Sequence, residues 1–152
     1  MVPLFISDVP LECINSAALE FHIPAKLIIS VLNVEHGKSG QRSMNKNGTY
    51  DLGPMQINSS WWPELYQYNI SPNQVLYDPC ININVGVWIL SKKIANGHDL
   101  LVGIGNYNST SLQYNLRYLQ NVKSKYILLN QLLQLSRFNM KLSNNTKFDQ
   151  KV

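Results

Sequence analysis

The sequence predicts a mainly α fold with a minimal hairpin or irregular β region, all in a single domain. Apolar residues recur at helical spacing along most of the chain, whereas the stretch 38–58 loses that periodicity and is rich in Gly, Ser and Asn. With 152 residues, of which 45% are hydrophobic and 14% charged, the chain is long enough to bury one core. No apolar run reaches the roughly 18 residues of a membrane-spanning helix, so we expect no integral membrane span.

In the first half of the chain, proline and glycine residues mark where the expected helices and the turn begin and end. A helix is expected after Asp8 and Pro10, and a second one from Pro24 to Glu35, with Gly37 as its C-terminal cap. The pair Asn47-Gly48 then predicts a turn, and therefore a hairpin or irregular loop.

The second half is expected to be helical throughout. Short helices should begin near Ser59 and Ser71, and Asp78-Pro79 offers an N-cap followed by proline at the first helical position. The remaining expected helices cover 79–96, 100–107 and 111–136, the last as one helix or two. We expect residues 1–136 to form the domain and residues 137–152 to form a polar, flexible C-terminal tail.

Composition excludes several classes of function. The net charge of +4 suits an anionic polymer, but it is equally ordinary for a small secreted protein. The basic residues are scattered, so we expect no nucleic-acid partner. The chain has no glycine-rich phosphate loop, and His22, His36 and His98 show no metal-ligand spacing. We therefore expect no metal and no cofactor.

The two cysteines, Cys13 and Cys80, leave two readings open. Their separation of 67 positions is not that of a redox pair, and two thiolates alone do not make a zinc site. They are either buried free thiols or one disulfide, and a disulfide would indicate a compartment outside the cytoplasm.

Glu35 is the first candidate for chemistry. It ends an apolar helix, so burial should raise the pKa of its carboxyl group, as a general acid near neutral pH requires. The alternative is a side chain that faces solvent or caps a neighbouring helix.

Three further features suit a sugar ligand. Gln56 and Asn58 carry amides that both donate and accept hydrogen bonds, as hydroxyl and N-acetyl groups demand. Trp61 and Trp62 follow directly, and either stack on sugar rings or belong to the core. Farther along, the hydroxyl of Tyr107 can orient a buried carboxylate, and the small Gly105 permits close approach.

Three motifs in this order resemble the soluble lytic transglycosylase family, and in particular its small members associated with secretion systems, pili or conjugation. The similarity covers roughly residues 11–126. The motifs are Val34-Glu35-His36-Gly37, Tyr50-Asp51-Leu52-Gly53-Pro54-Met55-Gln56-Ile57-Asn58-Ser59-Ser60-Trp61-Trp62 and Gly105-Asn106-Tyr107-Asn108. The chain departs from the family pattern at His36, Pro54 and Asn106, where the family usually has Ser, Leu and a small residue.

The resemblance implies a lysozyme-like fold, a peptidoglycan substrate and a Cys13–Cys80 disulfide. It also implies that Glu35 is acid and then base, that Tyr107 faces it, and that Asn108 supports the site. The implied substrate-binding residues are Met55, Gln56, Asn58, Trp61, Tyr107 and Asn108.

The resemblance further implies a partner in a secretion, pilus or conjugation machine, and a periplasmic or secreted location. The first ten residues carry no basic region of a signal peptide, so we expect none within this chain.

Two rival functions stay open. Asp51 either stabilises an oxocarbenium-like transition state, which would make the protein a hydrolytic lysozyme, or is a turn residue that bonds its own backbone. The second rival is a non-catalytic peptidoglycan-binding subunit of an envelope apparatus.

Overall fold

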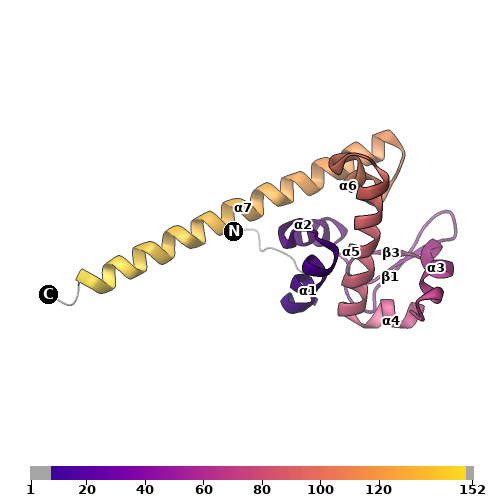
Figure 1. Ribbon diagram of the computed structural model, residues 1–152, viewed down its shortest axis with the longest axis horizontal. Coiled ribbons are helices and arrows are strands. Elements are labelled where there is room, and N and C mark those ends of the chain that lie inside the picture. Colours follow the sequence, from indigo (N-terminus) through magenta and orange to yellow (C-terminus); the bar gives the residue numbers. More distant parts are fainter. Residues whose placement is uncertain (1–7, 150–152) are drawn as a thin grey trace.

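The computed structural model describes residues 8–149, with side chains as far as Ser143, and most of this part is helical (Figure 1). Residues 1–7 and 150–152, which include the end of the expected tail, lie outside the described residues. The described helices, in chain order, are α1 (Leu11–Phe21), α2 (Ala25–Glu35), the 3-10 helix η1 (Ser59–Trp61), α3 (Trp62–Gln67), α4 (Pro72–Tyr77), α5 (Pro79–Asn96), α6 (Leu100–Asn108) and α7 (Leu112–Asp149). The expected mainly α fold with a minimal β region is confirmed.

Helix α5 runs through the middle of the molecule. Figure 1 shows α1 and α2 on one side of it, and the strands with α3 and α4 on the other. The helix is apolar on almost every face, as expected for one buried among other elements, and α1, α4 and α6 all pack against it. Asp78 begins it as predicted, since its carboxylate accepts hydrogen bonds from the N–H groups of Cys80 and Ile81.

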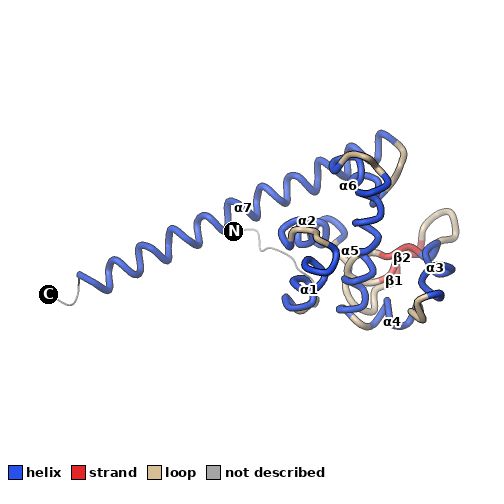
Figure 2. Tube along the Cα trace, viewed as in Figure 1, coloured by secondary structure: helices blue, strands red, loops and turns tan. Residues whose placement is uncertain are grey.

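A small antiparallel sheet fills the region predicted to be hairpin or irregular (Figure 2). Its strands are β1 (Arg42–Met44), β2 (Tyr50–Leu52) and β3 (Ile57–Asn58), in the order β1-β2-β3. Met44 pairs with Tyr50, so the predicted Asn47-Gly48 turn closes the β1–β2 hairpin, with Gly48 at φ 82°.

Asn82 holds this sheet to the central helix, although sequence reasoning assigned it no role. It is fully buried in α5, and its side-chain amide donates to the carbonyls of Leu52 and Val75, each at 2.9 Å. Its side-chain oxygen accepts from the N–H of Met55 at 2.8 Å. A buried amide is favourable only when it is paired in this way, so Asn82 fixes β2, α4 and the loop before β3 together.

The end of α2 corrects one expectation. The residue in the left-handed conformation is His36, at φ 56°, and its N–H donates to Leu32 O at 2.9 Å. Gly37 serves a different purpose. A Cβ atom at this position would lie 2.1 Å from Gly53 O, so glycine lets the chain after α2 touch the loop after β2.

Cys13 and Cys80 form a disulfide that joins α1 to the start of α5, which confirms the pairing implied by the resemblance. Helix α7 is a single helix, and it continues beyond Ser136 through the described part of the expected tail. The domain boundary at residue 136 stays a prediction. Among residues 8–149, no helix is both long enough and apolar enough to cross a membrane.

Candidate active site

A polar cleft of about 490 Å³ lies between the β-sheet and the C-terminal end of α6. It brings together residues from segments far apart in the sequence, including Glu35 from the end of α2 and Asp51 from β2. Its lining consists of Glu35, Asn45, Asp51, Gln56, Asn58, Ser60, Trp61, Lys93, Asn106, Tyr107, Asn108, Ser109 and Thr110.

Glu35 is the cleft carboxyl group whose pKa is raised. Its side chain is partly buried at the junction of α2 and the cleft wall. The pKa of its carboxyl group is raised to about 7. Burial is the largest cause and raises the pKa, the hydrogen bond from Tyr118 lowers it, and the negative charge of Asp51 raises it. Near neutral pH this carboxyl group can therefore both give and take a proton.

Tyr118 of α7 is the hydrogen-bond partner of Glu35, and sequence reasoning missed it. Its hydroxyl donates to Glu35 Oε1 at 2.6 Å, while its ring stacks on that of Tyr107, with centroids 6.3 Å apart. Burial raises the pKa of Tyr118 well above its ordinary value, so the phenol remains a donor across the physiological range.

Tyr107 lines the cleft as expected but has a different hydrogen bond. Its hydroxyl donates to the backbone oxygen of Met55 at 2.9 Å rather than to Glu35. Gly105 does permit a close approach, but the approaching group is Asn115 of α7, since a Cβ at position 105 would lie 2.2 Å from Asn115 Oδ1. Asn115 Nδ2 in turn donates to Asn106 Oδ1 at 2.8 Å.

Asp51 is held by two asparagine amides, one on each carboxylate oxygen. Asn58 Nδ2 donates to Oδ1 at 2.8 Å and Asn45 Nδ2 donates to Oδ2 at 3.0 Å. Both amides also donate to Thr49 Oγ1, each at 3.1 Å. These hydrogen bonds fix the carboxylate at the cleft wall. Its partners are side-chain amides, not the backbone of its own turn, as the alternative role of Asp51 would require.

The same contacts change the role of Asn58. Its amide nitrogen is engaged by Asp51 and Thr49, and its oxygen accepts from the N–H of Ser60 at 2.9 Å, at the start of η1. Asn58 therefore lines the cleft and positions Asp51, while its contact with sugar stays a prediction.

Gln56 also lines the cleft, in a backbone conformation unusual for a side-chain-bearing residue. It lies at φ 51°, and its Nε2 donates to Gly53 O at 2.8 Å, where the chain from Gly37 comes close. A left-handed residue that is not glycine is maintained by its surroundings, so the side-chain bond and the Gly37–Gly53 contact hold the loop in place.

Met55 does not line the cleft, which corrects the expectation. Its side chain is fully buried and packs against Gly86 of α5, where an added Cβ would lie 2.4 Å from the sulfur. The residue before it, Pro54, is also buried. Met55 reaches the site only through its backbone oxygen, which receives the hydroxyl of Tyr107.

Trp61 forms an aromatic wall of the cleft. It is half-buried, and its ring meets that of Trp88 edge to face at a centroid distance of 5.7 Å. Lys93 also lines the cleft, and its Nζ lies 5.6 Å from the centroid of the Trp61 ring. Trp62, by contrast, donates its indole N–H to Tyr50 and packs against the core.

Among the remaining cleft residues, one was expected at the site and the others were not. Asn108 lines the cleft on an exposed position, as expected. Asn45, Ser60, Lys93 and the pair Ser109-Thr110 were not predicted. Of these, only the position of Ser60 directly before the two tryptophans gave a hint in the sequence.

The helical body, the small sheet and a deep carboxyl group in a polar cleft together define a lysozyme-like protein. Residues 12–129 match the transglycosylase SLT domain family, and the chain belongs to that family.

The chain is also similar to several bacterial proteins. It is 35% identical over 99 residues to the invasion protein IagB of Salmonella typhimurium, which covers 64% of this chain and 62% of the relative. It is 30% identical over 132 residues to a peptidoglycan-binding-like protein of Escherichia coli O157:H7, covering 81% and 79%. Protein IpgF of Shigella flexneri is 22% identical over 121 residues, covering 76% and 80%. The match thus spans less than two thirds of the length of IagB.

Proposed function

We propose that this protein is a peptidoglycan lytic transglycosylase, in which Glu35 acts first as acid and then as base. The observation that carries the proposal is the position of Glu35 in a polar cleft of about 490 Å³, where burial raises the pKa of its carboxyl group to about 7. Membership of the transglycosylase SLT domain family supports the same reaction.

The proposed reaction needs no water. Glu35 gives its proton to the oxygen that links N-acetylmuramic acid to N-acetylglucosamine, and the bond from that oxygen to C1 of the muramoyl sugar breaks. The muramoyl C6 hydroxyl then bonds to C1 and its proton passes to Glu35. The product is a 1,6-anhydro ring, and Glu35 returns to its starting form. The two proton transfers are sequential, so one carboxyl group serves both.

The residues around Glu35 suit this cycle. Tyr118 donates to one carboxyl oxygen and thereby fixes the orientation of the group. We propose that Gln56, Asn58, Trp61, Tyr107 and Asn108 contact the glycan. The half-buried ring of Trp61 offers a face for a sugar ring, and the polar lining offers donors and acceptors.

A second candidate is hydrolysis, in which Asp51 stabilises the oxocarbenium-like transition state and water completes the reaction. The hydrogen bonds from Asn45 and Asn58 hold the Asp51 carboxylate in place at the cleft wall, and its negative charge raises the pKa of Glu35. The two reactions differ in their product, because hydrolysis leaves a reducing end instead of an anhydro ring.

Mass spectrometry of the fragments released from purified peptidoglycan tests the proposal. We expect anhydro-muropeptides from the wild type, none from Glu35→Gln, and a reduced yield of the same product from Asp51→Asn. Reducing-end products that vanish in both variants would establish the hydrolase instead. Binding to the glycan with no released product from any form would leave a non-catalytic binding subunit.

We also propose that the protein works outside the cytoplasm, where it opens the cell wall for a secretion, pilus or conjugation machine. The Cys13–Cys80 disulfide supports an oxidising compartment, and the substrate lies there too. The resemblance of its motifs to those of small transglycosylases from such machines supports the proposal that its partner is a component of one of them.

A further inference from the structure

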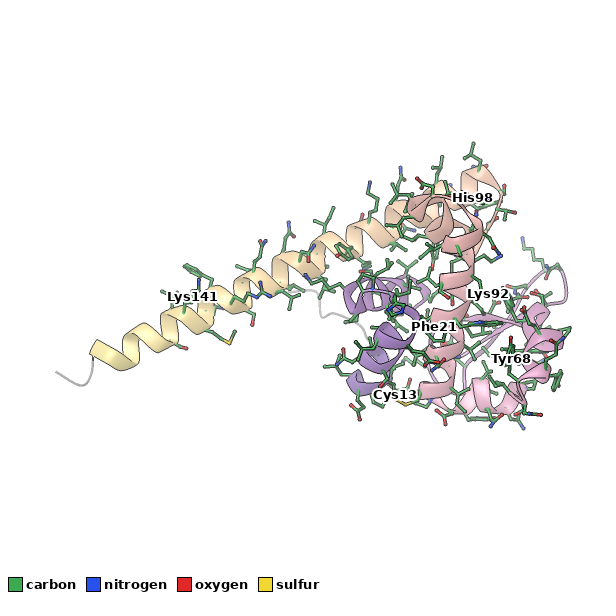
Figure 3. All side chains as sticks on the ribbon, viewed as in Figure 1. Cys13, Phe21, Tyr68, Lys92, His98 and Lys141 are labelled. Carbon is green, nitrogen blue, oxygen red and sulfur yellow. A yellow bond between two sulfur atoms is a disulfide. The ribbon has the colours of Figure 1, made fainter. Side chains whose placement is uncertain are left out.

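The distal part of α7, which includes Lys141, extends away from the body (Figure 3), and α7 combines several basic side chains with a lack of acidic ones over residues 112–143. Figure 1 shows this helix leaving the body beyond its contacts with α2 and α6. Near residue 130 the helix still meets the body, since Leu129 is buried and Lys26 Nζ donates to Asn130 Oδ1 at 3.0 Å. From residue 131 to residue 143 every side chain except Leu132 is exposed.

The apolar residues of this segment gather on a broad face. Leu128, Leu132, Leu135 and Leu142 are spaced by four, three and seven positions, which places them in one row along a helix of 3.6 residues per turn. Phe138 lies beside this row on one flank, whereas Leu133 and Met140 lie farther around the helix, between the row and Arg137. Phe138, Leu135, Met140 and Leu142 are each at least half exposed. Apolar surface of this extent on a free helix indicates a binding surface.

The opposite face is basic. Arg137 and Lys141 are four positions apart, so they lie on one side of the helix, away from the leucine row. Residues 112–143 contain five Lys or Arg residues and no Asp or Glu, whereas residues 8–111 contain six basic and eight acidic residues. The side chains of Lys123, Arg137 and Lys141 are exposed.

We propose that the distal part of α7 binds flat on an anionic lipid bilayer. The apolar face would enter the boundary between headgroups and acyl chains, while Arg137 and Lys141 reach the lipid phosphates along their flexible stems. The segregation of positive charge onto α7, with a formal net charge of −2 on residues 8–111, is complementary to such a surface and orients the molecule toward it.

A second copy of the chain fits these observations less well. A two-stranded coiled coil buries a narrow seam, whereas the apolar face of α7 also includes the exposed Phe138 beside the row. The polar Asn139 lies within that row, where it would lower the stability of such a coiled coil. A lipid surface covers a broad face and attracts the same charges.

Co-sedimentation of the full chain with vesicles tests the proposal. We expect binding to vesicles of 30% phosphatidylglycerol in phosphatidylcholine, little binding to pure phosphatidylcholine, and weaker binding as salt is raised. The double variant Arg137→Gln/Lys141→Gln should bind about thirtyfold more weakly, from the attraction of each basic residue to an anionic surface. Lys38→Gln/Lys46→Gln is the matched control, because it removes the same charge from exposed positions outside α7 and should bind nearly as the wild type does.

A second variant, Leu135→Ser/Leu142→Ser, tests the apolar face and should also lose vesicle binding while its circular dichroism shows the body folded. Equal loss in the Lys38/Lys46 control would overturn the proposal, because the attraction would then depend on total charge alone. Absence of binding to anionic vesicles would overturn it too. Sedimentation as an α7-dependent dimer without vesicle binding would assign the surface to a second copy, and tight binding of an acidic peptide helix instead of vesicles would assign it to a protein.

Discussion

Burial and the charge of Asp51 raise the pKa of Glu35, and the hydrogen bond from Tyr118 lowers it. Of the three, burial changes the pKa most. A general acid must be protonated to act, so the activity of the wild type should fall as the pH rises through about 7. In the proposed mechanism the same residue therefore determines both the reaction and its pH range.

Replacing Tyr118 with phenylalanine should separate these influences. Loss of the hydrogen bond removes the influence that lowers the pKa of Glu35, so the alkaline limb of the pH–activity profile should move to higher pH. The maximal rate should fall by about tenfold to a hundredfold, since the carboxyl group loses its fixed orientation. Tyr107→Phe is the control, because this hydroxyl donates to Met55 O and its loss should leave the limb in place. A limb that stays or moves to lower pH in Tyr118→Phe would contradict the assignment.

Sequence reasoning at the residue scale succeeded where local pattern suffices. The raised pKa of Glu35 was predicted because an apolar helix ends on it, and the disulfide was predicted through the resemblance. Tyr118 was missed because its contact with Glu35 depends on how α7 packs across α2, which no local spacing encodes. Met55 was misplaced because the resemblance put it in the cleft, while the pocket beside Gly86 that holds its side chain is formed by a distant helix.

At the scale of elements, the end of α2 and the loop after β2 are in direct contact beside the site. His36 ends the helix in a left-handed conformation, and Gly37 then passes in contact with Gly53 and Gln56. The sequence predicted a stop here, because glycine after an apolar helix is a frequent cap. It could not reveal that the close approach belongs to Gly37 and the left-handed turn to His36.

Gly37→Ala should therefore disrupt the site. The added methyl group would meet backbone at Gly53, which cannot move without shifting the loop that carries Gln56. We expect a loss of about 2–4 kcal/mol in the free energy of unfolding and a larger loss of activity. Gly48→Ala is the comparison, because its Cβ would meet nothing within 4 Å and only the strain of its positive φ applies. That variant should lose about 1 kcal/mol. Urea unfolding measures both values, and equal values would refute the steric explanation.

The fold as a whole was predictable because helical periodicity dominates the chain. The mainly α class, the hairpin at Asn47-Gly48 and the start of α5 at Asp78 all follow from local chemistry. What could not be predicted is how far α7 continues. The segment after Arg137 is polar and lacks a core-facing stripe, which favours a tail, yet it contains neither proline nor glycine to end a helix.

The disulfide between α1 and α5 should contribute substantially to the stability of the whole molecule. It closes a loop with a sequence separation of 67, for which the chain-entropy model gives about 4 kcal/mol. Cys13→Ala/Cys80→Ala should lower the free energy of unfolding by up to this amount, as measured in urea. A reducing agent should destabilise the wild type to a similar degree and leave the double variant unchanged. If the reductant had no effect on the wild type, the bond would not constrain the unfolded chain.

Tyr118 and Ser143 belong to one unbroken helix, and this has a consequence for where the protein can cut. A helix rises 1.5 Å per residue, so the side chain that orients Glu35 and the far end of the exposed segment are separated by about 37 Å along a stiff axis. A molecule held by that far end cannot shorten or lengthen this distance as a flexible linker would. With the proposed membrane binding and glycan cleavage, such a molecule would reach glycan strands only at a distance set by the helix, so α7 would act as a spacer of fixed length.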